Sequence, residues 1–300
     1  MSEPACGNDD SISGEKTDKT TPVKSSLRRR LIKSALAAGI LSVPTAGYAH
    51  YIEPSSIRIA QLDIPVKGWP ASKNGFRIGH ISDLHADNER AVRRTQEAAR
   101  ILKSQKPDAV FITGDYITRR AKPFMDECAE ALSVLANVRY GAYAVLGNHD
   151  WYAGDADTIA QALKDVGIEV LINESVPLKG IKGVHIVGLG PISYSAARPE
   201  IALAKVPEDA LKLLLIHEPD YAHESPEGFA LQFSGHSHGG QIRIPGLPPI
   251  HTPTGARIYK EGYEQGKSHP VYTTRGVGMV GPQFRFCCPP EVSVITLRPA

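Results

Sequence analysis

Five short apolar runs, each followed at once by a polar patch, most constrain what this chain can fold into. Runs of four to six residues rich in Val, Ile, Leu and Phe predict buried strands. In open α/β sheets, ligands bind beyond the carboxyl ends of the strands. The five patches are therefore expected to meet along one edge of the fold. The predicted strands are Phe76–Ile81, Ala109–Thr113, Tyr143–Leu146, Leu211–Ile216 and Phe229–Ser234.

The polar patches carry carboxylate, imidazole and amide side chains and no thiolate. They are Asp83-Leu84-His85, Gly114-Asp115, Gly147-Asn148-His149-Asp150, His217 and Gly235-His236-Ser237-His238. Taken singly, each has a structural interpretation, such as a turn residue, a loop cap or a hydrogen-bonded core histidine. Together they hold five of the 11 histidines, and this concentration favours a site that uses imidazoles.

The donor types indicate a site for transition-metal ions. A mixture of carboxylate, imidazole and amide oxygen suits Mn²⁺, Fe or Zn²⁺. The number of candidate ligands is too large for one open catalytic ion, but it fits two ions about 3.5–4 Å apart. Glycines at three of the patches suit turns whose backbone approaches a site closely. The candidate ligands are Asp83, His85, Asp115, Asn148, His217, His236 and His238.

In order, spacing and residue type, the patches resemble the calcineurin-like metallophosphoesterase superfamily, whose motifs run D-x-H, G-D, G-N-H-[DE], H and G-H-x-H. The resemblance extends from about Arg77 to Leu297. It implies a four-layer α/β sandwich over residues 50–300, with two mixed β-sheets flanked by helices. It also implies the metal roles: Asp83, His85 and His238 would hold one ion, Asn148, His217 and His236 the other, and Asp115 would bridge both.

The activity implied by this resemblance is hydrolysis of a phosphate ester by a hydroxide that bridges the two ions, with His149 as general acid for the leaving oxygen. Two divalent ions, two carboxylates and one hydroxide leave about one positive charge, which favours a monoanionic phosphodiester as the small anionic substrate. Two alternatives stay open. One is a UDP-2,3-diacylglucosamine pyrophosphatase of lipid A biosynthesis, which membrane-associated relatives suggest; the other is a catalytically silent binding scaffold.

The rest of the body alternates strands with helices, and its charge excludes one class of partner. Helices are predicted over 88–105, 123–136 and 156–166 from apolar stripes at helical spacing, and Ile244–Gly266 is expected to be a long surface loop. The chain has 34 basic and 32 acidic residues. Because this balance gives no broad basic field, nucleic acid is not a favoured partner.

The first 49 residues are predicted to be separate from the body. Met1–Ser26 is polar and predicted to be disordered. The basic run Arg28-Arg29-Arg30-Leu31-Ile32-Lys33, followed by the mildly apolar 34–49, resembles a twin-arginine export signal with a cleavage site before His50. A basic surface helix and an uncleaved anchor are the alternatives.

Export would make the twin-arginine machinery a partner, with a membrane surface as a further one. The body would then lie in the periplasm or on the outer face of the cytoplasmic membrane. The motifs Gly239-Gly240-Gln241, Tyr272–Gly278 and Pro289-Pro290-Glu291 look like the exported or membrane-associated bacterial branch.

Overall fold

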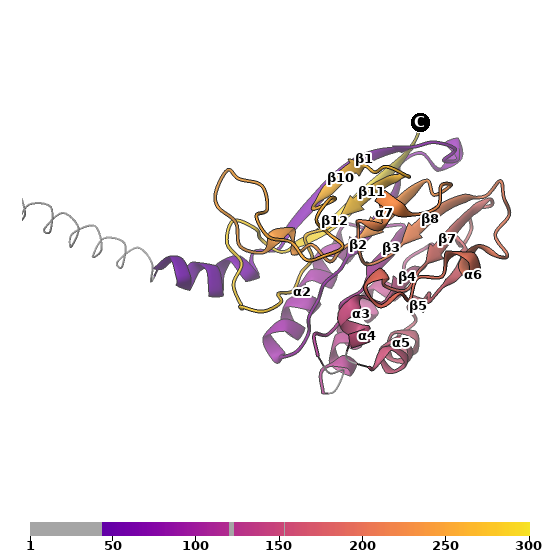
Figure 1. Ribbon diagram of the computed structural model, residues 1–300. Coiled ribbons are helices and arrows are strands. Elements are labelled where there is room, and N and C mark those ends of the chain that lie inside the picture. Colours follow the sequence, from indigo (N-terminus) through magenta and orange to yellow (C-terminus); the bar gives the residue numbers. More distant parts are fainter. Residues whose placement is uncertain (1–43, 120–122, 153) are drawn as a thin grey trace, which may run out of the picture. The chain divides into compact units, whose positions relative to one another are not determined.

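The computed structural model describes residues 44–119, 123–152 and 154–300. By contacts, the chain divides into Met1–Thr45 and Ala46–Ala300. The predicted disordered segment and the paired arginines lie outside the described residues. The second unit contains every predicted ligand (Figure 1).

The first sheet has six strands in the order β1-β12-β2-β3-β4-β5. Neighbouring strands run parallel except for β12 and β2, which pair antiparallel. The last strand of the chain thus lies between the first two, a pairing that joins segments more than 200 residues apart. The strands are β1 (Arg58–Val66), β2 (Phe76–Ile81), β3 (Ala109–Thr113), β4 (Ala142–Val145), β5 (Glu169–Val170) and β12 (Glu291–Pro299).

The second sheet also has six strands, in the order β10-β11-β9-β8-β7-β6. Its central strands are parallel, and an antiparallel pair closes each edge. The strands are β6 (Glu174–Pro177), β7 (Val184–Gly188), β8 (Leu211–Leu215), β9 (Leu231–Ser234), β10 (Gly262–Gln265) and β11 (Pro270–Thr273).

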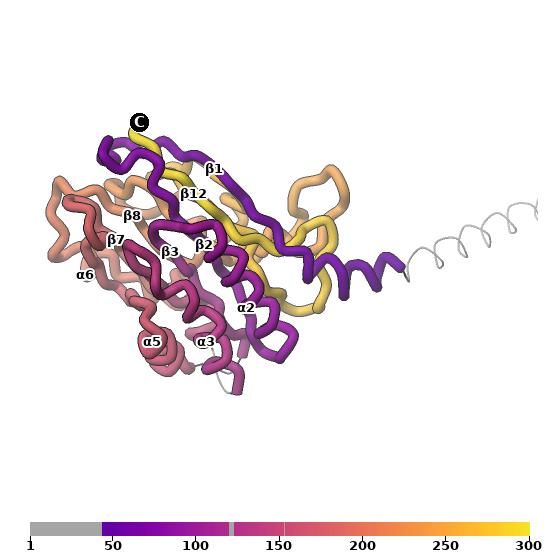
Figure 2. Tube along the Cα trace, turned by 180° about the vertical axis from the view of Figure 1, so that it is seen from behind, coloured from indigo at the N-terminus to yellow at the C-terminus, as the bar shows by residue number. Residues whose placement is uncertain are grey.

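The two sheets pack face to face, and helices cover their outer faces (Figures 1 and 2). Phe111, Leu213 and Phe233 belong to the core between the sheets. Their neighbours on alternate positions point outward, because successive side chains of a strand face opposite ways; Ile112 lies in the core under the helices and Leu214 in the smaller core on the second sheet. This arrangement confirms the predicted four-layer sandwich. The helices are α2 (Glu89–Ser104), α3 (Met125–Ala136), α4 (Asn148–Tyr152), α5 (Ala156–Asp165), α6 (Pro199–Leu203) and α7 (Tyr221–Glu224).

Helix α2 shows how closely local signals set the element bounds. The Asn88 side chain accepts a hydrogen bond from the Ala91 backbone N–H at 3.0 Å and so caps the first turn. Leu102 and Ala98 are fully buried on the stripe that faces the sheet. The observed ends of the three predicted helices lie within two residues of the predicted ones.

The predicted surface loop Ile244–Gly266 is wrong at its end. Residues Gly262–Gln265 form the edge strand β10, which pairs with β11. Four residues with mostly exposed side chains show no apolar alternation, so the pairing could not be recognised from the pattern. Among the described residues, no helix combines the length and the hydropathy that a bilayer-spanning segment needs.

Candidate metal centre

The predicted ligands converge where five strands end. Asp83, Asp115 and Asn148 follow β2, β3 and β4 of the first sheet, while His217 and His236 follow β8 and β9 of the second. Because these strands are parallel within each sheet, their carboxyl ends meet at one edge of the sandwich, as the sequence predicts.

Backbone strain is concentrated at the same residues. Ten non-glycine residues of the described chain have a positive φ, and five of these are predicted ligands. Such conformations cost roughly 1–3 kcal/mol each and persist only where the surroundings hold them, most often at functional sites. The five are Asp83 (φ 54°), His85 (φ 45°), Asp115 (φ 57°), His236 (φ 67°) and His238 (φ 49°).

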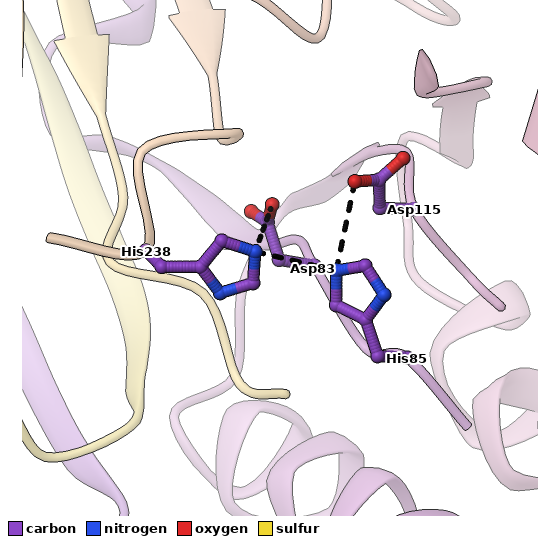
Figure 3. A group of neighbouring side chains, drawn as sticks. All are labelled: Asp83, His85, Asp115 and His238. Atoms are coloured by element: carbon purple, nitrogen blue, oxygen red, sulfur yellow. Dashed lines mark hydrogen bonds and ion pairs between the residues drawn. The ribbon is translucent and has the colours of Figure 1, made fainter. Parts of the chain in front are cut away.

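Ligand atoms gather in two buried groups that share Asp115. One group is Asp83, His85, Asp115 and His238, and the other is Asp115, His217 and His236; within each, the ligand atoms all lie within 4.8 Å of one another. Figure 3 shows the first group, with the two rings and the two carboxylates turned toward a common centre. Asp115 Oδ2 lies 3.5 Å from His85 Nε2 and 3.1 Å from His217 Nε2. One carboxylate therefore faces both groups.

The outer nitrogens of these imidazoles are held by the protein. His217 Nδ1 donates to the Thr113 carbonyl at 2.6 Å, and His236 Nε2 donates to the Thr254 carbonyl at 2.9 Å. The inner nitrogens, His217 Nε2 and His236 Nδ1, are then left facing each other at 3.2 Å. If both rings are neutral, their lone pairs point at one another, and either a proton on His217 or a cation bound between the rings removes that repulsion.

His85 and His238 form a similar pair in the other group. Their Nε2 atoms are 3.3 Å apart, and His85 Nδ1 is 2.9 Å from Thr118 Oγ1. Burial lowers the pKa of His85 to about 3 and the pKa of His238 well below its ordinary value. Both rings are thus neutral at pH 7, which is the form in which imidazole binds a metal.

The two carboxylates are ionised beside these rings. Burial raises the pKa of Asp83 to about 6. Burial also acts to raise the pKa of Asp115, but the neighbouring His217 and His85 outweigh it and hold that pKa well below its ordinary value. In turn, Asp115 outweighs burial at His217 and raises the pKa of that ring. The site therefore favours positive charge between Asp115 and His217.

Asn148 supplies the remaining predicted ligand. Its Oδ1 is buried and has no hydrogen-bond partner among the described residues. A buried carbonyl oxygen without a partner is costly, and this one lines a cavity together with Asp115 and His236. An ion bound there would satisfy it, so the donor set fits the predicted pair of metals.

Two glycines let the loops come close enough. A Cβ added at Gly147 would lie 2.2 Å from Asp115 Oδ1, and one at Gly235 would lie 2.2 Å from Asp83 Oδ2. Any side chain at either position would displace a carboxylate that the site needs. The glycines of these patches thus serve close approach, as the sequence predicts.

His149 lies at the cavity beside the ligands, with its ring fixed by the backbone. Its Nδ1 donates to the Thr118 carbonyl at 2.9 Å, and its ring centroid is 5.1 Å from that of His85. Its backbone N–H donates to Asp115 Oδ1 at 2.9 Å. Thr118 therefore contacts both His85 and His149, a role that sequence reasoning missed because Thr118 lies outside the motifs.

Of the two roles that its sequence position suggests for Asp150, orienting His149 or capping the next helix, the contacts fit the cap, and they extend to a second loop. Asp150 is fully buried, and its carboxylate accepts the backbone N–H groups of Asp115 and Tyr116, both at 2.9 Å, and of Gly147 at 2.8 Å. A weaker fourth contact, at 3.5 Å, comes from Ile117. Asp150 thus ties the loop after β3 to the loop after β4.

Replacing Asp150 by Asn is expected to lower the free energy of unfolding by about 2–4 kcal/mol, because the amide N–H₂ would face backbone donors that then lose their acceptor. Denaturant unfolding in a chelator, which removes any contribution from metals, measures the change. Asp157→Asn is the matched control, since Asp157 is exposed at the start of α5 and should change stability by under about 0.5 kcal/mol. Equal effects of the two substitutions would contradict this role.

The cavity over the ligands has a volume of about 430 Å³. Its floor contains Asp115, Asn148 and His149, and Ile242, Val280 and Pro282 are among the apolar residues of its walls. A phosphate ester with an apolar substituent fits such a lining, with the phosphate at the ligands and the substituent at the walls.

Comparisons with known proteins agree with this site. A sequence model of the family described as calcineurin-like phosphoesterase matches residues 76–240, a range that contains all seven predicted ligands and His149. The metallophosphoesterase YkuE of Bacillus subtilis is 31% identical over 285 residues, covering 92% of this chain and 99% of the relative. The phosphodiesterase YaeI of Escherichia coli is 29% identical over 276 residues, with 90% and 99% covered. The UDP-2,3-diacylglucosamine pyrophosphatase LpxG of Chlamydia trachomatis is 26% identical over 320 residues, with 88% and 95% covered.

Proposed function

The chain belongs to the calcineurin-like phosphoesterase family and is a metal-dependent phosphoester hydrolase, and we propose that it hydrolyses a phosphodiester at a centre of two divalent transition-metal ions. The observation that carries the proposal is the shared position of Asp115 between two buried ligand groups. A single carboxylate between two sets of ligands is what a dinuclear site requires.

The ligands divide between the two ions as the groups suggest. Asp83, His85 and His238 would hold one ion, because their ligand atoms cluster on one side of Asp115. His217, His236 and the unpartnered oxygen of Asn148 would hold the other. Mn²⁺, Fe and Zn²⁺ all accept this mixture of nitrogen and oxygen donors.

When bound, two divalent ions would supply Lewis acidity at the phosphoryl group and would lower the pKa of water, so that hydroxide is available near neutral pH to attack phosphorus. The residues of the chain position the ester and move the proton. His149 donates its Nδ1–H to the Thr118 carbonyl, which fixes the ring and leaves Nε2 as the nitrogen whose proton goes to the leaving alkoxide. The apolar cavity wall shields that proton transfer from bulk water.

The absence of Lys and Arg from the cavity supports a diester. Among the described residues that line it, none is Lys or Arg. A phosphomonoester dianion carries one more negative charge than a diester, and the lining offers no permanent cation to compensate it in addition to the metal ions and the proton on His149. The name of the relative YaeI, a phosphodiesterase, agrees with this choice.

Full-length protein loaded with Mn²⁺ is expected to contain about two metal ions per chain by elemental analysis. It should hydrolyse bis(4-nitrophenyl) phosphate with a kcat/KM at least about tenfold above that for 4-nitrophenyl phosphate, because of the extra charge on the monoester. Chelation should abolish both activities. A metal content of one or less would sink the dinuclear centre, and faster monoester hydrolysis would contradict the diester assignment.

A second candidate is cleavage of the pyrophosphate of UDP-2,3-diacylglucosamine, the substrate named for the relative LpxG. The apolar residues Ile242, Val280 and Pro282 in the cavity wall favour a substrate with an apolar part. Release of UMP from this substrate, at a higher kcat/KM than for any simple diester, would support the candidate.

We further propose that the body is exported with its N-terminal segment retained. The support for export is the sequence Arg28–Lys33 ahead of an apolar stretch. The support for retention is that Ala49, next to the predicted cleavage site, is buried and its carbonyl accepts a hydrogen bond from the Arg285 backbone N–H at 2.9 Å. Cleavage before His50 would also turn His50 into a chain terminus, although its ring is held in the domain by a contact of 2.7 Å between Nδ1 and the Gln283 carbonyl.

The double substitution Arg28→Lys and Arg29→Lys keeps the charge and removes the guanidinium geometry. We expect it to trap full-length, active protein in the cytoplasm, whereas the wild type should face outward from the membrane at its full length. Cell fractionation with protease accessibility measures both. If wild type and variant both remain in the cytoplasm, export is excluded, and the cytoplasmic nucleotide-lipid substrate becomes the leading candidate.

A further inference from the structure

One end of the domain exposes an unusual concentration of large apolar side chains. Residues 48–52 and 242–250 contain seven of the 15 large hydrophobic residues that are exposed in the described chain. Six of them define what we call the apolar platform: Tyr51, Ile52, Ile242, Ile244, Leu247 and Ile250, with exposed fractions of 47–68%. Exposed apolar residues gathered in this way mark interaction sites more often than isolated ones do.

The segments of the apolar platform are joined by packing, although about 190 residues separate them in the sequence. His50 contacts the Gln283 carbonyl at 2.7 Å, and its ring lies 5.2 Å from that of Phe284. Two residues further, Phe286 accepts a hydrogen bond from the Arg243 backbone N–H and pairs with Ile242. Figures 1 and 2 both show the corresponding indigo, yellow and orange segments at the same end of the domain.

The segments that form and flank the apolar platform carry basic residues but no acidic ones. The stretches 44–52, 241–260 and 276–288 contain no Asp or Glu, although the chain as a whole has 32 in 300 residues. Arg257 is exposed within them, and Lys260 lies against the Pro249 carbonyl at 3.5 Å. The next acidic residue, Glu261, is paired with both Arg243 and Arg275. Outside these stretches, Asp220 accepts the backbone N–H groups of Arg257 and Ile258, and the exposed Glu264 lies near Lys260. An apolar surface whose own stretches carry basic and no acidic residues is complementary to anionic phospholipid.

The sequence that leads into the domain also favours anionic phospholipid as the partner of the apolar platform. The chain enters the domain at Tyr48–Ile52, within the apolar platform, directly after a segment that carries Arg28, Arg29, Arg30 and Lys33 ahead of the apolar residues 35–43. A basic cluster beside an apolar stretch is typical of segments that bind anionic membranes. The cavity over the metal ligands opens at the same end, because Ile242 both belongs to the apolar platform and lines the cavity.

We propose that the apolar platform docks on an anionic phospholipid bilayer and presents the mouth of the cavity to phosphate esters held in that bilayer. Tyr51 and Ile52 from one segment and Ile244, Leu247 and Ile250 from the other enter the interfacial region. Arg257 and Lys260 lie beside the lipid phosphates. The docking surface goes beyond the proposed function, since binding to lipid requires neither metal ions nor turnover.

The test reads out insertion at one position of the full-length protein. Leu247→Trp places a fluorophore within the apolar platform, and Ile201→Trp places one on α6, at the opposite end of the domain (Figure 1). Each variant is mixed with vesicles of phosphatidylcholine and phosphatidylglycerol that contain a brominated phosphatidylcholine. We expect strong quenching for Leu247→Trp and none for Ile201→Trp beyond the signal of the wild type.

A second variant tests the energetic contribution. The triple substitution Ile244→Ser, Leu247→Ser and Ile250→Ser should weaken vesicle binding by at least about tenfold and leave hydrolysis of a water-soluble diester unchanged. The triple substitution Val134→Ser, Tyr194→Ser and Ile201→Ser is the matched control, because these exposed side chains lie outside the apolar platform; it should bind as the wild type does.

Any of three results would contradict the proposed docking surface. The first is Leu247→Trp fluorescence that is not quenched on vesicles to which the protein binds. The second is wild-type affinity of the variant with Ser at positions 244, 247 and 250, and the third is no vesicle binding at all. Equal binding to vesicles of phosphatidylcholine alone would overturn the preference for anionic lipid. A blue shift of Leu247→Trp emission with protein concentration, without vesicles, would instead identify the apolar platform as a contact between two copies of the chain. Since the vesicle measurements do not depend on turnover, their failure is distinct from failure of the proposed hydrolase function.

Discussion

Replacing Asp115 by Asn is expected to lower the affinity for the second metal ion, and with it the turnover, by roughly 10³-fold. Asp115 Oδ2 faces both ligand groups, at 3.1 Å from His217 Nε2 and 3.5 Å from His85 Nε2. Two unit charges about 4 Å apart interact by about 4 kcal/mol at an effective dielectric constant near 20, which corresponds to that factor and is the smaller estimate, because each ion is divalent. The amide keeps the shape of the side chain and removes the charge that holds two cations together.

His85→Ala and Asn148→Ala are the comparisons that make this prediction specific. Each of these side chains is assigned to one ion only, so we expect both variants to retain more metal and more activity than Asp115→Asn. Asp157→Asn, on the exposed start of α5, controls for the loss of a carboxylate elsewhere. Metal titration followed by elemental analysis, together with kcat at saturating Mn²⁺, gives the order. An Asp115→Asn variant more active than the other two would contradict a bridging role.

Replacing His149 by Ala is expected to reduce turnover by about 10²–10⁴-fold, the usual contribution of a general acid, while both metal ions stay bound. The metals should stay because the link from this residue to Asp115 is made by the backbone N–H, which alanine keeps. The loss should be largest for diesters with alkyl leaving groups, whose oxygen needs a proton. It should be smallest for 4-nitrophenyl esters, whose leaving group departs as a stable anion.

The leaving-group series distinguishes proton donation from a general disturbance of the site. His223→Ala is the control, because His223 lies on α7, where the only hydrogen-bond contact of its ring among the described residues is with the Tyr259 hydroxyl at 3.5 Å. We expect it to leave kcat within about a factor of two of the wild type. If His149→Ala slows alkyl and nitrophenyl esters equally, or loses metal, His149 does not act as the acid.

Much of this architecture could be predicted because the signals are local. Buried parallel strands are apolar along their whole length, so the runs before Asp83, Asp115 and Asn148 stand out from the sequence. The start of α2 could be predicted for a similar reason, since Asn88 caps it with its own side chain. Strand β10 was missed because the side chains of its four residues are mostly exposed and show no apolar alternation, although it pairs with β11, which begins only five residues later.

The residues that support the ligands could not be predicted in the same way. Thr113, Thr118 and Thr254 bind ligand or acid imidazoles, two of them through backbone carbonyls alone. Every residue has a backbone carbonyl, so no side-chain pattern in the sequence marks the ones that accept a hydrogen bond from an imidazole. Asp150 is part of a motif, but its partners are backbone N–H groups of a loop more than 30 residues earlier in the chain.

The sequence by itself determined which residues carry the chemistry, because carboxylate and imidazole side chains placed directly after buried strands must gather at one edge of a sheet. Only the tertiary structure decided how they are used. Packing the second sheet on the first brings His217 to Asp115, which makes one carboxylate common to two ligand groups. The same packing places the loop after β9 beside the first turn of the domain and so creates the apolar platform. Contacts of this kind depend on the positions of segments far apart in the chain, and local preferences of the sequence do not specify them.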